Sequence, residues 1–341
     1  MDPLVAVCIS TFNRFADLHT CLTSIMEQDY VNLKIIIYDN YSTDETVKLL
    51  KLYEATFPEM VTVFYGERDQ PNAMITLNAT FKEAARIGAD YALVMDDDAY
   101  ILDDTVISKL VACMVDNVAI VGSNVKSEDG SWQMPIRKQN GEFLSSEEID
   151  ELGLIAYQEF HGACALFDVK KCGIFNWYDE SFVIYMNELD LATKALNAGY
   201  NVLFRSDAVA YHVGVGDKNA CNKRAYYFVR NYNTVLTRNF RTVISRLKAV
   251  TLHTFMSGGY FAERILIHNT CNNRLKIFNF SYLMMRAYIN AAYRSFFPDE
   301  RHQFKNQDFF EQSMYNGFKR CIADRMKWIK GRELTATKGV R

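Results

Sequence analysis

Apolar runs alternate with amphipathic helical segments along the first third of the chain. The runs are rich in valine and isoleucine and occupy residues 4–9, 35–38, 61–65, 91–95 and 118–121. Between the first two, apolar side chains recur with helical spacing at Leu18, Cys21, Leu22, Ile25 and Met26. Near-continuous apolar strands separated by helices are typical of a parallel sheet covered on both faces. The pattern therefore predicts an α/β fold whose strand carboxyl ends share one edge, where such sheets bind ligands.

Charge divides the chain into two parts. Residues 1–222 hold 16 Lys and Arg against 34 Asp and Glu, a balance of −18, whereas residues 223–341 hold 22 against 7, a balance of +15. The second part is aromatic and helical by spacing, so we expect an α/β domain at residues 1–218 and a basic, mainly helical region at residues 219–341. Such a region suits an anionic membrane surface or contacts in a homo-oligomer, although the two parts could instead attract each other. We expect no nucleic acid among the partners.

The sequence also predicts a cellular location. The eight cysteines are scattered without a CxxC pair, a pattern typical of reduced cysteines and not of a disulfide framework or a zinc site. No run of about 18 uncharged apolar residues occurs, and the amino terminus lacks the pattern of a signal peptide. We therefore expect a cytoplasmic protein, with peripheral association at the inner face of the cell membrane as a further hypothesis.

Three adjacent carboxylates, Asp96, Asp97 and Asp98, end the fourth apolar run. Because side chains alternate along an extended strand, Asp96 and Asp98 are expected to share one face while Asp97 points to the other. Two carboxylates on one face suit Mg²⁺ or Mn²⁺, which add phosphate oxygens and water to one or two protein carboxylates. The structural alternative is an acidic turn that caps the next helix, a role for which Asp103 and Asp104 are better placed.

Two further candidates follow short predicted strands. Asn187 is a good N-cap, and Glu188 then lies in the first turn of the predicted helix. The Glu188 carboxylate could accept a proton from a hydroxyl. The alternative is that the acids complement the helix dipole, which is the favoured role for Asp190. His212 follows a strand at 209–211 and could be a third metal ligand or simply a packed residue.

Local signals complete the pattern and exclude two kinds of nucleotide site. Ser42 and Glu45 have the spacing of a capping box, which predicts a helix that begins there.

Neither a P-loop nor a complete dinucleotide fingerprint is present in the sequence. A nucleotide would therefore bind through a metal ion and the strand ends.

In this order the segments resemble the motifs of family-2 glycosyltransferases with a GT-A fold, most closely the bacterial galactofuranosyl- and rhamnosyltransferases. The matching segments, within about residues 4–233, are VCISTFNR, IIYDNYSTDET, VMDDDAY, MNELDL, YHVG and YYFVRN. The chain departs from the family pattern in two places. It has RDQPNAMITLN where the family often has a glycine-rich stretch, and a Glu after Asn187 where most members have paired acids with an Asp base.

The resemblance implies an inverting, metal-dependent transfer of a sugar from a UDP- or dTDP-sugar to a hydroxyl. The acceptor would be a cell-surface glycan or a lipid-linked glycan, and galactofuranose is favoured over rhamnose as the sugar. The implied metal ligands for Mn²⁺ or Mg²⁺ are Asp96, Asp98 and His212, and the implied base is Glu188. The residues implied to bind the nucleotide sugar are Thr11, Phe12, Arg14, Asp39 and Asp97.

Two competing functions make different demands on the sequence. A sugar nucleotidyltransferase should carry a glycine- and arginine-rich phosphate loop after its first strand, and STFNRF is not such a loop. A non-catalytic scaffold at a membrane surface would explain the basic region but not the carboxylates at the strand ends. Binding of UDP or dTDP with Mn²⁺ distinguishes the scaffold from the enzyme.

Overall fold

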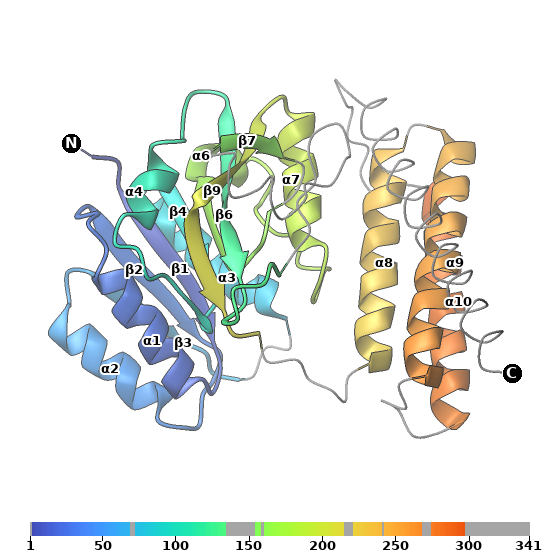
Figure 1. Cartoon of the computed structure of the whole chain (residues 1–341), viewed down its shortest axis with the longest axis horizontal. Coiled ribbons are helices and arrows are strands. Elements are labelled where there is room, and N and C mark those ends of the chain that lie inside the picture. The colour runs from blue at the N-terminus through green and yellow to red at the C-terminus, as the bar shows by residue number, and fades with distance from the viewer. Residues whose placement is uncertain are drawn as a thin grey trace, which may run out of the picture.

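The computed structural model of the protein describes residues 2–68, 72–133, 154–157, 160–214, 221–240, 242–267 and 274–296. These residues form an α/β part and, beside it, three long helices (Figure 1). The strands are β1 (Val5–Thr11), β2 (Leu33–Asp39), β3 (Val61–Tyr65), β4 (Tyr91–Met95), β5 (Ala99–Tyr100), β6 (Val118–Lys126), β7 (Leu154–Tyr157), β8 (Cys164–Asp168) and β9 (Asn201–His212). The helices of the α/β part are α1 (Phe15–Met26), α2 (Thr46–Thr56), α3 (Ala73–Arg86), α4 (Val106–Val111), α6 (Val169–Gly173) and α7 (Asn187–Asn197).

The described strands form one mixed sheet in the order β3-β2-β1-β4-β8-β6-β9-β5, with β7 also paired to β9. The first four strands of this order are parallel, and β8 is antiparallel to both of its neighbours. The alternation of β1 is visible in its packing, because Val7 belongs to one hydrophobic cluster and Cys8 to the other. Helices α1, α2 and α4 contribute to the first cluster, and α3, α6 and α7 to the second. The predicted α/β class with a GT-A-like sheet between helices is confirmed.

The carboxyl ends of the parallel strands meet as the pattern predicted. Thr11 at the end of β1 lies opposite Asp39 at the end of β2, and the Asn40 N–H donates to the Thr11 carbonyl over 2.8 Å. Strand β4 lies on the other side of β1 and leads directly into Asp96. Three separate stretches of sequence therefore deliver polar side chains to one edge.

The predicted capping box at Ser42 is wrong. Helix α2 begins at Thr46. Its N-cap residue is Glu45, whose side chain makes no capping hydrogen bond. The Ser42 hydroxyl instead accepts the Asn13 N–H over 2.9 Å, and Asp44 Oδ1 accepts the Thr46 N–H over 3.0 Å. The Ser42 hydroxyl therefore joins two loops at the sheet edge instead of capping the helix.

The prediction that Asn187 is the N-cap of α7 is wrong by one residue. The cap is Met186, with a left-handed φ of 66°, and Tyr185 before it is also left-handed, with a φ of 67°. The Asn231 side-chain amide donates to the carbonyls of Ile184 and Tyr185 over 2.7 and 2.9 Å. A distant side chain on the next helix thus holds the strained turn that starts α7.

The basic region is helical, as predicted, through α8 (Cys221–Asn239), α9 (Val243–Ile267) and α10 (Arg274–Phe296). These helices pack against one another around a core that includes Val235, Leu236, Phe240, Ala249, Val250 and Ala291. Phe182 and Leu189 of the α/β part join the same core. The rest of the basic region that the sequence predicts to be helical lies outside the described residues.

Arg238 of α8 ties the helices to α7 through a buried ion cluster. Its guanidinium donates to Asp190 Oδ1 over 2.9 Å and to Asp179 Oδ2 over 2.6 Å, and Lys194 pairs with Asp190 over 2.8 Å. Burial alone would raise the pKa of Asp179, but the Arg238 charge and hydrogen bond lower it to about 2. The Asp190 carboxylate is buried, so its role as an ion-pair partner goes beyond the dipole effect that the sequence favoured.

We expect Arg238→Ala to lower the free energy of unfolding by about 3 kcal/mol, because removing one partner leaves a buried charge without compensation. Urea unfolding followed by circular dichroism measures the change. The control is Lys248→Ala on α9, which removes an exposed cation and should change stability by less than about 0.5 kcal/mol. Equal stability of the two variants would contradict the role of the cluster.

Among the described helices, none combines the length and the apolarity needed to cross a bilayer.

Candidate active site

A tight turn presents the carboxylates at the end of β4. The turn runs from Asp96 to Ala99 and is closed by the Ala99 N–H, which donates to the Asp96 carbonyl over 3.0 Å. After the turn, β5 pairs with the end of β9, so that Ala99 lies opposite His212. The Val213 N–H donates to the Asp98 carbonyl over 3.0 Å and closes the junction. The turn and the end of β9 therefore bring residues more than a hundred positions apart to the same place.

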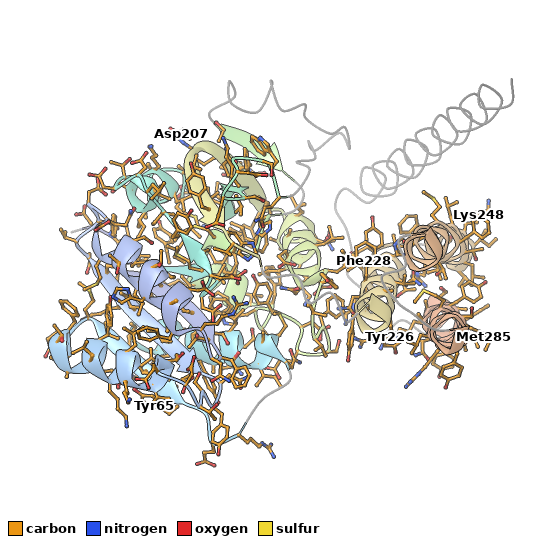
Figure 2. All side chains as sticks on the ribbon, turned by 60° about the horizontal axis from the view of Figure 1, so that its bottom comes forward. Tyr65, Asp207, Tyr226, Phe228, Lys248 and Met285 are labelled. Atoms are coloured by element: carbon orange, nitrogen blue, oxygen red, sulfur yellow. The ribbon has the colours of Figure 1, made fainter. Side chains whose placement is uncertain are left out.

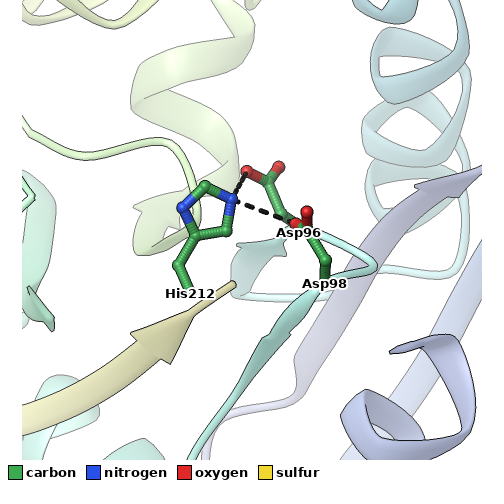
Figure 3. Close-up of side chains that lie close together, drawn as sticks. All are labelled: Asp96, Asp98 and His212. Carbon is green, nitrogen blue, oxygen red and sulfur yellow. Dashed lines mark ion pairs between the residues drawn. The ribbon is translucent and has the colours of Figure 1, made fainter. Parts of the chain in front are cut away.

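Asp96, Asp98 and His212 converge at this junction (Figure 3). His212 Nε2 lies 3.0 Å from Asp98 Oδ1 and 3.5 Å from Asp96 Oδ2. One ligand atom from each residue lies within 4.8 Å of the others. The sequence placed Asp96 and Asp98 on one face by assuming an extended strand, whereas the structure achieves the same grouping with a turn.

Gln133 orients His212. Its side-chain oxygen lies 2.5 Å from His212 Nδ1, and its amide group also donates to the His212 carbonyl. Because an amide oxygen can only accept, Nδ1 carries a ring proton and donates it to Gln133, so Nε2 is the nitrogen that faces the aspartates and can ligate a metal ion once its own proton is released. A hydrogen bond to the far nitrogen of a ligating histidine is the usual way to fix the tautomer at a metal site.

The charges in this cluster are coupled. Burial alone would lower the pKa of His212, but the hydrogen bond to Asp98 and the charges of both aspartates raise it. Burial would raise the pKa of Asp98, yet the hydrogen bond and charge of His212, together with the Arg14 charge, lower it. A proton on His212 and a cation between the carboxylates satisfy the same negative charge, so metal binding here would release that proton.

The donor set fits a divalent cation. Two carboxylate oxygens and one imidazole nitrogen are within reach of one ion, and the half-exposed Asp96 leaves room for further oxygen ligands. Mn²⁺ and Mg²⁺ take such oxygen-rich sets and complete them with phosphate oxygens and water.

Asp97 points away from the cluster, as the sequence predicted. The Thr11 hydroxyl donates to Asp97 Oδ2 over 2.7 Å. Burial, together with the charge of Asp98, raises the pKa of Asp97 to about 7. Asp39, opposite Thr11, accepts the Ser42 N–H over 3.2 Å, and burial raises its pKa as well. Thr11, Asp39 and Asp97 therefore form a polar group next to the metal ligands.

Arg14 and Phe12 complete this side of the site. Arg14 Nη1 lies 2.9 Å from Asp17 and 3.4 Å from Asp98, so its charge reaches the metal ligands. Phe12 is 42% exposed at the end of β1, which leaves its ring open to stack on a planar group. All five residues implied to bind the nucleotide sugar lie at or just after the carboxyl ends of β1, β2 and β4.

Glu188 packs against the short segment that leads into β8. A Cβ atom built on Gly162 would come within 2.5 Å of Glu188 Oε1, so the carboxylate is packed against this glycine. The Ala163 carbonyl, one residue on, accepts the Asp96 N–H over 3.1 Å. Residues 162–163 thus contact both the base predicted from the sequence and the turn that carries the metal ligands.

The sequence did not point to Gln133, His161 or Gly162. No local spacing links Gln133 to His212, because their contact depends on the pairing of Gln133 with β6 and of β6 with β9. The HGA stretch at 161–163 carries a histidine and a glycine just before an apolar strand, the same signal that selected Asp96 and His212 at strand ends. Applied to the start of a strand, that signal would have found His161.

Residues 6–173 match the model of the family described as glycosyl transferase family 2. The matched segment includes Asp39 and the turn with Asp96 and Asp98, whereas Glu188 and His212 follow it. No curated protein sequence matches the chain.

The chain is similar in fold to three solved structures. The mannosyltransferase PcManGT from Pyrobaculum calidifontis, in complex with GDP-Man and Mn²⁺, is 16% identical with a TM-score of 0.54, over 88% of this chain and 89% of that one. TarS from S. aureus is 13% identical with a TM-score of 0.57, over 93% and 91%. GalNAc-T7 with UDP, GalNAc and Mn²⁺ is 15% identical with a TM-score of 0.51, and the match spans 68% of this chain but 52% of that one. At these identities the likeness is one of fold.

Proposed function

The chain is a glycosyltransferase with a family 2 domain at residues 6–173, and we propose that it transfers a sugar with inversion from a UDP- or dTDP-linked donor to a hydroxyl, aided by Mn²⁺ or Mg²⁺. The observation that carries the proposal is the convergence of Asp96, Asp98 and His212 beside the polar group of Thr11, Asp39 and Asp97. Two of the similar solved structures were determined with a nucleotide or nucleotide sugar and Mn²⁺, which supports a donor of this class.

Asp96, Asp98 and His212 would hold the metal ion, with Gln133 accepting the Nδ1 proton of His212 so that Nε2 is the nitrogen that ligates the ion. When bound, the ion supplies Lewis-acid neutralisation of the charge that develops on the departing diphosphate. Arg14 adds positive charge close to the same position. Thr11, Phe12, Asp39 and Asp97 would hold the nucleoside, with Phe12 stacking on the base.

Glu188 would act as the general base. Its carboxylate takes the proton of the acceptor hydroxyl while the hydroxyl oxygen forms a bond to the anomeric carbon. The bond from that carbon to the phosphate oxygen breaks on the opposite face, and its electron pair leaves with the diphosphate. A single displacement of this kind inverts the anomeric configuration and needs no covalent intermediate.

Hydrolysis of a panel of nucleotide sugars tests the donor class. The motif resemblance favours galactofuranose as the sugar, with rhamnose next, so we expect slow Mn²⁺-dependent release of UDP or dTDP from one such donor. Release of pyrophosphate from a nucleoside triphosphate and a sugar 1-phosphate would instead support the sugar nucleotidyltransferase. Failure to turn over any member of the panel, with or without acceptor glycans, would favour the non-catalytic scaffold.

We assign donor binding to residues 1–218 and acceptor or surface contacts to residues 219–341. Helix α10 carries a stripe of large apolar side chains at helical spacing, each more than half exposed: Tyr282, Met285, Ile289, Tyr293 and Phe296. Met285 of α10 and Lys248 of α9 lie on the side of the helices that faces away from the α/β part (Figure 2). Exposed aromatic and basic residues together favour the interface of an anionic membrane.

Charge favours a membrane over a second copy as the partner of this stripe. The sequence of α8, α9 and α10 contains 11 Lys and Arg but one Glu, and the positive charge exceeds the negative even when the buried Arg238 and Arg246 are left out. Two such surfaces would repel each other, whereas each basic residue near an anionic bilayer contributes about 1 kcal/mol of binding. A membrane-bound transferase would meet a lipid-linked glycan acceptor at this surface.

We expect the protein to sediment with liposomes that contain a quarter anionic lipid at low salt, and to be released at about 0.5 M salt, where screening is short-ranged. Removal of residues 319–341, which are rich in Lys and Arg, should weaken the binding, and so should Met285→Glu combined with Ile289→Glu. Liposomes of neutral lipid alone are the control. A stable dimer in solution without liposome binding would reverse the assignment in favour of a homo-oligomer.

A further inference from the structure

His161 lies next to a predicted metal ligand, and the residue after it contacts the predicted base. Its ring stands edge-on to the ring of His212, with centroids 5.5 Å apart and an interplanar angle of 65°. The next residue, Gly162, contacts Glu188, and Ala163 accepts the N–H of Asp96. Three consecutive residues therefore contact the predicted metal ligands at both ends and the predicted base in the middle.

The hydrogen bonding of His161 determines which nitrogen carries the ring proton. The Ala163 N–H donates to His161 Nδ1 over 3.1 Å. A nitrogen that accepts a hydrogen bond has no proton of its own, so the proton of the neutral ring is on Nε2. His161 is half-buried, and within the described parts of the chain Nε2 meets no hydrogen-bond partner. The backbone hydrogen bond thus fixes Nε2–H as a donor that is available to a ligand.

Reaction geometry indicates which ligand this donor meets. In an inverting displacement the base and the leaving diphosphate lie on opposite faces of the anomeric carbon. If Glu188 is the base and Asp96, Asp98 and His212 hold the diphosphate, the sugar-phosphate end of the donor must lie between them. The His161 ring contacts His212 and Gly162 contacts Glu188, which puts His161 beside that position. Every polar group of a sugar diphosphate there can accept a hydrogen bond.

We propose that His161 binds the donor, its Nε2–H donating a hydrogen bond to an oxygen at the sugar-diphosphate junction. This inference rests on the proposed function and assigns it a further binding residue. The oxygen is either a phosphate oxygen or a sugar hydroxyl, and the two share the chemistry of a hydrogen-bond acceptor. The alternative is that His161 only packs on His212 and supports its ring.

Matched substitutions separate these two roles. In His161→Asn the amide oxygen can take the place of Nδ1 and accept the Ala163 N–H, but nothing reaches the position of Nε2. His161→Gln places an amide N–H near the position that Nε2 of His161 occupies in wild type. His161→Phe keeps a ring against His212 but has no hydrogen-bond donor. The control is His19→Asn, the same change at an exposed histidine of α1.

Calorimetric titration with Mn²⁺ and each of UDP, dTDP and GDP, and then with the nucleotide sugar that wild type hydrolyses, measures the affinity. We expect His161→Asn and His161→Phe to bind the nucleotide sugar about tenfold more weakly, as for loss of a hydrogen bond to a charged or polar ligand. His161→Gln should retain most of the affinity, and His19→Asn all of it. A loss already present with the nucleoside diphosphate assigns the bond to a phosphate oxygen, and a loss seen only with the nucleotide sugar assigns it to a sugar hydroxyl.

Three outcomes would overturn the inference. The first is unchanged affinity of His161→Asn for both kinds of ligand. The second is equal weakening in His161→Gln and His161→Asn together with a weaker affinity for Mn²⁺ alone, which shows that His161 acts only by supporting His212. The third is a wild-type protein that binds no nucleoside diphosphate at all, which removes the proposed function and the inference with it. If His161→Phe melts at a lower temperature than wild type, its weaker binding could come from lost stability, and the comparison of His161→Asn with His161→Gln then distinguishes the two roles of His161.

Discussion

Glu188→Gln is expected to lower the rate of sugar transfer by about 10²-fold or more while donor binding stays near the wild-type value. The substitution keeps the size of the side chain and the start of α7, but it removes the carboxylate that would accept the acceptor's proton. The glutamine still fits against Gly162, because the contact involves the same atoms. Initial rates of transfer, measured beside calorimetric titration of the donor, separate the two quantities.

The control for this substitution is Glu27→Gln, which makes the same chemical change at an exposed residue after α1. It should leave both rate and affinity unchanged. A parallel loss of donor binding and of thermal stability in Glu188→Gln would show that Glu188 merely stabilises the first turn of α7. Unchanged transfer would remove Glu188 from the mechanism altogether.

The second large effect concerns the metal ligands. We expect Asp98→Ala and Asp96→Ala each to lower turnover by about 10²-fold or more, the scale for losing stabilisation of a developing anion. Asp98→Ala should lower turnover more than Asp96→Ala does, because Asp98 is buried and lies 3.0 Å from His212 Nε2, whereas Asp96 is half-exposed. Rates measured over a range of Mn²⁺ concentrations show whether excess metal restores activity.

Asp116→Ala, in an exposed loop before β6, is the matched control for the two aspartates. Full activity of both Asp96→Ala and Asp98→Ala in the presence of EDTA would rule out a metal at this site.

The fold was predictable because its signals are local. Each strand of the parallel half is a short apolar run, and each helix shows a stripe with helical spacing, so order along the chain was enough to predict the sheet and its functional edge. Helix ends were less predictable. Ser42 and Asn187 both have the chemistry of a cap, but tertiary contacts with Asn13 and Asn231 decide where α2 and α7 begin.

The site was predictable where its residues sit at strand ends and was missed where a contact depends on long-range pairing. Asp96, Asp98 and His212 were found from their positions, and the structure brings them together. Gln133 contacts His212 through strand pairing that no spacing in the sequence reveals. His161 gains its interest only from a backbone hydrogen bond and from the rings and carboxylates around it.

The most direct test of the central claim is calorimetric titration of UDP and dTDP into the protein with and without Mn²⁺, comparing wild type with His212→Ala. If Asp96, Asp98 and His212 hold the ion that binds the diphosphate, wild type will bind one of the two nucleotides far more tightly with Mn²⁺, and the variant will lose that difference. Metal-independent binding of equal strength in both proteins would contradict the account.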